Sequence, residues 1–151
     1  PMYYFAYGSN LHREQMKNRC QDSVPMVKVK LEGYRLNFNR VADIVEDESS
    51  EVWGAIYTVS PRDIKNLDRY EGYPHFYDKL DVKVEDDQGK TYRAFVYVMT
   101  SKGLGEPSDG YYRIIEESYR DWGLQLKPLR QALTESRQGV PVCPSGPRQE
   151  R

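Results

Sequence analysis

The sequence has few of the residues that build metal sites and disulfide frameworks. Its 151 residues include two cysteines, Cys20 and Cys143, and two histidines, His12 and His75. The cysteines are far apart and fit no CxxC pattern, so we expect no disulfide framework and a reduced, cytoplasmic setting. The histidines have no clustered partners, which argues against a metal site and against a histidine-based catalytic triad.

The sequence also lacks a large net charge and long apolar runs. The formal net charge is −1, and the 22 basic residues are interspersed with 23 acidic ones, so no basic field is available for nucleic acid. No segment approaches the roughly 20 apolar residues of a membrane span, and no signal-peptide pattern is present. We therefore expect a protein that binds neither nucleic acid nor membrane.

What is present fits one globular domain. The hydrophobic fraction is 38% and the charged fraction 30%, which is typical of a chain with a single core and a well-solvated surface. We expect the domain over residues 1–135, followed by a flexible tail over 136–151 that is rich in Pro, Gly and Ser. Thirteen tyrosines against four phenylalanines bring hydroxyls into apolar surroundings, as a polar pocket requires.

The pattern of apolar residues predicts an α+β fold. Ser60-Pro61-Arg62-Asp63 predicts a helix start, with Ser60 as the cap, whereas the acidic and Ser-rich residues 41–51 resemble a turn segment. Because the strands are not in regular alternation with helices, we expect a mostly antiparallel, barrel-like sheet with a few short helices. The predicted strands cover 2–7, 26–39, 52–59, 76–85 and 91–99, and the predicted helices cover 11–19, 61–71, 111–122 and 127–135.

The segment Tyr7-Gly8-Ser9-Asn10-Leu11 is the first candidate for chemistry. A buried strand ends where Gly8 permits a tight turn, and Ser9 and Asn10 can cap the helix that follows. The first amides of a helix have no intrahelical acceptor and can bind a carboxylate or a developing oxyanion. Taken alone, the segment fits an ordinary strand–turn–helix connection better than a binding site.

Glu71 is the second candidate. It lies at a predicted helix end, between Tyr70 and Gly72 and close to Tyr73 and Pro74. The helix dipole and an apolar surround both raise the pKa of a carboxyl there, which suits proton transfer near neutral pH. A solvated glutamate at a frayed helix end is the alternative.

Other polar groups suggest less specific chemistry. Tyr77, Tyr111 and Tyr112 could donate hydrogen bonds to a ligand, although most tyrosines pack on sheets with a wet hydroxyl. Asp43 belongs to an acidic stretch without metal-ligand spacing, which we interpret as a solvated loop; the alternative is that Asp43 faces the pocket. We interpret His75 as a surface neighbour of Glu71.

Several blocks of the sequence together resemble a known family. Tyr4 to Leu11 (YFAYGSNL) looks like the opening signature of the γ-glutamylcyclotransferase-like family, also called AIG2-like or BtrG-like. The resemblance continues in Glu51 to Gly54 (EVWG), Leu67 to Gly72 (LDRYEG) and Pro107 to Tyr111 (PSDGY), in the order of the family. It covers nearly the whole chain except the tail, and it implies a barrel-like α+β fold with a cavity at one end.

The resemblance also implies residue roles. Glu71 corresponds to the catalytic acid/base, and the substrate-binding residues correspond to Tyr7, Gly8, Ser9, Asn10, Leu11, Tyr77 and Tyr111, with Tyr112 as a competitor for the last position. The implied substrate is a small γ-glutamyl amide, whose own α-amino group attacks its γ-carbonyl to release 5-oxoproline and an amine or amino acid. This acyl transfer needs neither metal nor cofactor, and the expected oligomeric state is a monomer or a homodimer.

The amine half of the substrate stays open at this point. The glutathione-specific branch has an apolar residue where this chain has Asn10, which argues against glutathione. A non-catalytic ligand-binding or interaction module of the same fold is the main alternative, and an amide-cleaving enzyme that makes no 5-oxoproline is a third. We also expect Glu71 to lie within the reach of one small ligand from residues 7–11.

Overall fold

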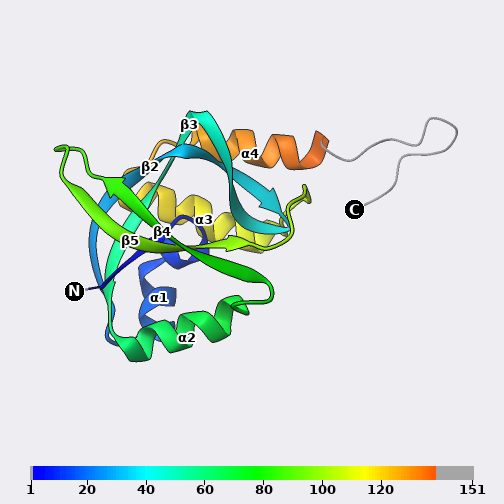
Figure 1. The fold of residues 1–151 in the computed structure, drawn as a ribbon. Helices are drawn as coiled ribbons and strands as arrows, with labels where there is room; N and C mark the ends of the chain where they lie inside the picture. The colour runs from blue at the N-terminus through cyan, green and yellow to red at the C-terminus, as the bar shows by residue number, and fades with distance from the viewer. Residues whose placement is uncertain (1, 139–151) are drawn as a thin grey trace, which may run out of the picture.

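The computed structural model describes residues 2–138, and its centre is a closed five-stranded barrel (Figure 1). The order around the barrel is β1-β3-β2-β4-β5, and β1 and β5 close it as a parallel pair at Tyr4 and Phe95. All other neighbouring strands are antiparallel. This confirms the expected mostly antiparallel, barrel-like sheet. The strands are β1 Met2–Ala6, β2 Val24–Asn39, β3 Val41–Val59, β4 Tyr77–Glu85 and β5 Thr91–Met99.

Short helices fill the connections and cover the barrel (Figure 1). After β1 come a 3₁₀ turn, η1, over Ser9–Leu11 and α1 over Arg13–Arg19, and α2 over Pro61–Glu71 links β3 to β4. At the end of the described chain, α3 covers Asp109–Trp122 and α4 covers Lys127–Gln138 along β2. None of the helices described in residues 2–138 is long and apolar enough to cross a membrane.

The expected turn over 41–51 is wrong. These residues belong to β3, which pairs with β2 along a long, bent hairpin. The hairpin turns at Arg40, whose φ of 69° is unusual for a residue other than glycine. The register between the two strands shifts near Gly33, as at a β-bulge.

The predicted helix boundaries agree best with the structure for α2. Its capping box forms as predicted, because the Ser60 hydroxyl accepts from the Asp63 amide while the Asp63 carboxylate accepts from the Ser60 amide. By contrast, α4 continues to Gln138, three residues beyond the predicted end of the domain at 135. The rest of the expected tail lies outside the described residues.

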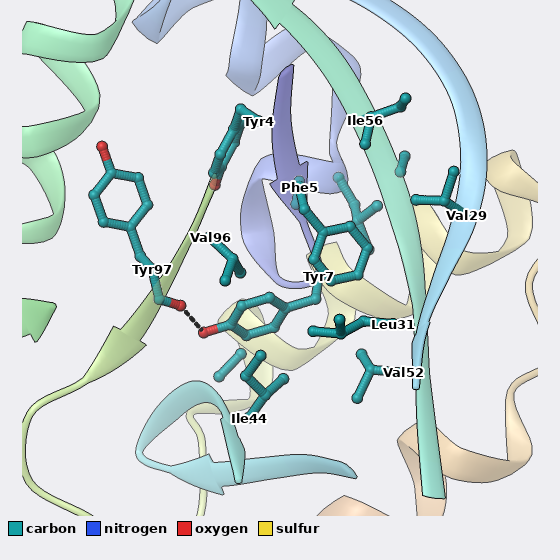
Figure 2. Close-up of a cluster of buried hydrophobic side chains, with 14 of the residues drawn as sticks. Tyr4, Phe5, Tyr7, Val29, Leu31, Ile44, Val52, Ile56, Val96 and Tyr97 are labelled. Atoms are coloured by element: carbon teal, nitrogen blue, oxygen red, sulfur yellow. Dashed lines mark hydrogen bonds between the residues drawn. The ribbon is translucent and has the colours of Figure 1, made fainter. Parts of the chain in front are cut away.

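The core fills the barrel and the space beneath the helices. Figure 2 shows Phe5, Val29, Val52 and Ile56 packed together inside the barrel, with Tyr7 next to them. The Tyr7 hydroxyl crosses to β5 and donates to the backbone carbonyl of Tyr97 at 2.7 Å. The interior of the barrel around Phe5 is therefore apolar, and the Tyr7 hydroxyl is a polar group at its edge.

Candidate active site

A cavity of about 480 Å³ opens where the end of β1 meets the end of α2. Its size is in the range of small-molecule sites. Of the predicted site residues, the structure brings together Tyr7, Gly8, Ser9, Asn10, Glu71, Tyr77 and Tyr111 on its walls. The expectation that Glu71 lies within one small ligand of residues 7–11 agrees with this shared cavity.

The turn after β1 differs from the expected helix start. Ser9 and Asn10 belong to the 3₁₀ turn, and the helix begins only at Arg13, where the cap is His12 accepting from the Gln15 amide. Ser9 and Asn10 begin a 3₁₀ turn, so their amides have no intrahelical acceptor. Within the described chain, these two amides form no other backbone hydrogen bond. The turn thus keeps donors for an anion, although the macrodipole of the following helix is not behind them.

Gly8 is needed for close packing at this turn. A Cβ at Gly8 would lie 3.0 Å from the Cβ of Ala42 and 3.6 Å from the Tyr111 hydroxyl. The first distance is shorter than an ordinary van der Waals contact, so any side chain here would push β3 away from the turn. Glycine at position 8 therefore allows the turn to pack closely against β3 at the cavity wall.

Asn10 and Leu11 act within the protein. The Asn10 amide group donates to the Tyr4 hydroxyl at 3.0 Å and its carbonyl accepts from Arg19, so its side chain is already occupied. Leu11 is wholly buried and does not line the cavity. Its carbonyl accepts from the Trp122 indole at 2.8 Å. The assignment of Leu11 to ligand contact is corrected on these grounds.

Among residues 2–138, Glu71 is the only one that brings a carboxylate to the cavity wall. It is the last residue of α2, and Gly72 ends the helix in the left-handed conformation, with a φ of 69°. Burial raises the pKa of the Glu71 carboxyl from its ordinary value of 4.5 to about 7, and the positive charge of Arg19 partly opposes this rise. Glu71 can therefore both accept and donate a proton near neutral pH.

Tyr77 and Tyr111 hold the same backbone residue from two sides. The Tyr77 hydroxyl donates to the Ala42 carbonyl at 2.9 Å, and the Tyr111 hydroxyl accepts from the Ala42 amide at 2.9 Å. Burial raises the pKa of both phenols, so they stay neutral. The Tyr111 hydroxyl keeps its own proton for a ligand, while Tyr112 packs against Phe38 and does not line this cavity.

Sequence reasoning missed three other tyrosines that line the cavity, Tyr4, Tyr70 and Tyr97. Tyr4 accepts from Asn10, and Tyr97 donates to Asp68 of α2 at 2.6 Å. Both alternate with core positions on their strands, and the pairing of β1 with β5 is what brings them together. No sequence signal distinguished them from the other tyrosines of the chain.

Asp43 and His75 were expected at the surface, and only His75 is there. The Asp43 carboxylate is wholly buried, pairs with Lys102 at 3.0 Å and accepts from the Met99 amide at 2.9 Å. This ion pair fixes β3 beside the loop after β5, and the solvated-loop interpretation of Asp43 is wrong. His75 is exposed and its side chain does not line the cavity.

The site therefore combines one proton-exchanging carboxyl, the cationic side chain of Arg69, two backbone donors and several neutral hydroxyls. Within residues 2–138, no group of three or more His, Cys, Asp or Glu side chains could hold a metal ion. Such a set of groups can bind an anionic, amide-containing molecule and move protons on it.

Comparisons with known proteins agree with this geometry. A sequence model of the family described as gamma-glutamyl cyclotransferase, AIG2-like, matches residues 4–122. The chain belongs to this family. Human gamma-glutamylcyclotransferase is 29% identical over 137 residues, which covers 82% of this chain and 73% of the human protein, and the bovine protein shows the same values.

The fold comparison gives the same result. A solved structure titled gamma-glutamyl cyclotransferase superposes with a TM-score of 0.79 at 26% identity, over 99% of this chain and 94% of that chain. These matches support an enzyme of the gamma-glutamyl cyclotransferase, AIG2-like family, with cyclotransferase activity in the general sense. The matched region contains every residue of the cavity wall.

Proposed function

We propose that the protein cleaves small γ-glutamyl amides by ring closure, releasing 5-oxoproline and an amine or amino acid. The observation on which this proposal depends is the Glu71 carboxyl, which has a pKa of about 7 and shares a cavity with the amides of the 3₁₀ turn. Relatives named gamma-glutamylcyclotransferase support the same reaction class.

The reaction needs two proton transfers from the attacking nitrogen. The ionised Glu71 carboxylate takes a proton from the substrate α-ammonium, and the free amine attacks the γ-carbonyl to form the C–N bond of a five-membered ring. Glu71 returns that proton to the leaving nitrogen as the old C–N bond breaks. The ring nitrogen loses its second proton as the released amine gains one, so no net proton is consumed.

The remaining groups bind and orient the substrate. In this proposal the amides of Ser9 and Asn10 hold the developing oxyanion or the substrate carboxylate, and the Tyr111 hydroxyl donates to the same group; the lack of other backbone hydrogen bonds from these two amides supports this role. Because nucleophile and electrophile belong to one molecule, folding the substrate supplies much of the rate, and effective molarities of about 10⁵ M or more are known for such reactions. The reaction needs no cofactor in this scheme.

Product analysis tests the proposal. Incubation with γ-glutamyl-alanine and γ-glutamyl-lysine is expected to release 5-oxoproline, and Glu71→Gln is expected to abolish this release because an amide cannot exchange the proton. Release of glutamate without 5-oxoproline would indicate a hydrolase. No reaction with any γ-glutamyl donor would favour a ligand-binding module of the same fold.

A further inference from the structure

Arg19 joins the two halves of the cavity, although it does not line it. It is the last residue of α1, and its guanidinium donates to the Asn10 side-chain carbonyl in the 3₁₀ turn. The other guanidinium nitrogen donates to the Tyr70 hydroxyl, and the guanidinium lies 3.4 Å from the centre of the Tyr70 ring. Its backbone carbonyl accepts from Asn66 of α2 at 3.1 Å.

These contacts fix the guanidinium rigidly. Arginine is planar and carries its donors in a fork, so two hydrogen bonds and a stacked ring determine both its position and its orientation. Tyr70 directly precedes Glu71 on α2, and Asn10 belongs to the 3₁₀ turn that lines the cavity. The two catalytic parts of the site are therefore attached to one side chain.

We propose that Arg19 is a positioning residue of this site: it ties the 3₁₀ turn to the end of α2 and holds a fixed positive charge near Glu71. The proposal rests on the proposed function for its catalytic meaning, but its structural part can be measured in the free protein. The two terminal guanidinium nitrogens of Arg19 donate hydrogen bonds to Asn10 and Tyr70. Its effect on Glu71 is therefore the electrostatic effect of its charge.

Arg19 is the charged group that acts on Glu71 from the surrounding elements, and Arg69 of α2 itself also lies on the cavity wall. The groups coupled to Glu71 from those elements are Arg19 of α1, Tyr4 and Tyr7 at β1, Tyr77 of β4, Tyr97 of β5 and Tyr111 of α3. Burial raises the pKa of each of these phenols above its ordinary value, so all of them stay neutral where Glu71 titrates. Asp43 of β3 is paired with Lys102.

A titration of Glu71 in the free protein tests the charge. Isotope-labelled glutamate allows the Glu71 carboxyl to be followed by NMR, with an expected midpoint near 7 in the parent protein. Arg19→Gln removes the charge, and the midpoint is expected to rise by roughly one pH unit. Arg13→Gln is the matched control, since Arg13 lies on the same helix and stacks on Trp122 at 3.9 Å instead. It should leave the midpoint unchanged.

Two more variants separate charge from attachment. Arg19→Lys keeps the charge but not the fork, so the Glu71 midpoint should stay near its parent value while kcat for 5-oxoproline release falls. Tyr70→Phe removes one anchor at a half-exposed position and should raise the midpoint by less than Arg19→Gln does. In Arg19→Gln the acid limb of the kcat/KM profile should rise with the NMR midpoint, which gives about a tenfold loss well below that midpoint.

The outcomes are distinct from those of the proposed function. An unshifted Glu71 midpoint in both Arg19→Gln and Tyr70→Phe, with native circular dichroism, would overturn the role of Arg19. A shifted midpoint in a protein that makes no 5-oxoproline would support the role of Arg19 and contradict the proposed reaction.

Discussion

At the scale of a single residue, the fold makes the ionised form of the Glu71 carboxyl unfavourable. The carboxyl lies at the end of α2 on a cavity wall rich in tyrosines, and its burial makes ionisation cost more in the folded protein than in the unfolded chain. The folded pKa of about 7 lies above the ordinary value of 4.5. Stability is therefore lost as pH rises from about 4.5 to about 7, and the loss is complete above that window.

This linkage predicts that Glu71→Gln stabilises the protein at alkaline pH. At pH 8 the variant should unfold with up to about 3 kcal/mol more free energy than the parent, since the pKa shift corresponds to that amount. At pH 4 the Glu71 carboxyl of the parent is largely protonated in both the folded and the unfolded protein, so most of the gain should disappear. Urea unfolding at the two pH values checks this. Exposed Glu117 offers a control, since Glu117→Gln should change stability by less than about 0.5 kcal/mol at either pH. An equal effect of Glu71→Gln at both pH values would contradict the account.

A substitution of Leu11 tests whether this residue belongs to the core and not to the binding site. Its side chain is wholly buried in the core, so Leu11→Ala should cost about 2–5 kcal/mol of unfolding free energy. Leu104→Ala, at an exposed position, should cost far less. Denaturant unfolding measures both. If Leu11→Ala weakened substrate binding without lowering stability, Leu11 would belong to the binding site after all.

At the scale of secondary structure, the elements with strong local signals were predictable. The capping box of α2 and the hairpin between β4 and β5 agree with the sequence patterns. The first half of β3 was not predictable, because Glu46, Glu48 and Ser49 occupy exposed positions of the hairpin, while Asp43 is buried against Lys102. Such strands need few apolar residues, since only one face packs. The turn at Arg40 has no glycine to mark it.

The pairing of β1 with β3 depends on Gly54, although this glycine does not have a positive φ. A Cβ on Gly54 would lie 2.2 Å from the Ala6 carbonyl oxygen and 2.8 Å from the Phe5 ring. Gly54→Ala should therefore separate the two strands, and we expect a loss of at least about 3 kcal/mol or failure to fold, since over-packing a rigid backbone contact is costly. Thermal unfolding followed by circular dichroism measures the effect.

Gly110→Ala is the matched control for this prediction. Gly110 lies in the first turn of α3, and no atom lies within 4 Å of its Cβ position. Alanine there should raise stability by about 0.4–1 kcal/mol, because the unfolded chain loses freedom. Similar unfolding temperatures for the two variants would show that Gly54 is not needed for strand packing.

At the scale of the whole molecule, the family resemblance predicted more of the site than local patterns did. Glu71, Tyr77 and Tyr111 are distant in sequence and meet because the barrel closes and α3 packs against the 3₁₀ turn. The supporting contacts of Arg19 and Tyr97 were not predictable, because nothing in the sequence marks which charge or phenol faces the cavity. The buried Asp43–Lys102 pair was missed for the same reason.

The central claim is that the α-nitrogen of the substrate becomes the ring nitrogen of the product. The most direct test uses γ-glutamyl-alanine labelled with ¹⁵N at the α-amino group and follows the label by NMR. The account predicts that the label appears in the lactam nitrogen of 5-oxoproline with the parent protein and stays in the substrate with Glu71→Gln. Appearance of the label in free glutamate, or equal turnover by the two proteins, would contradict it.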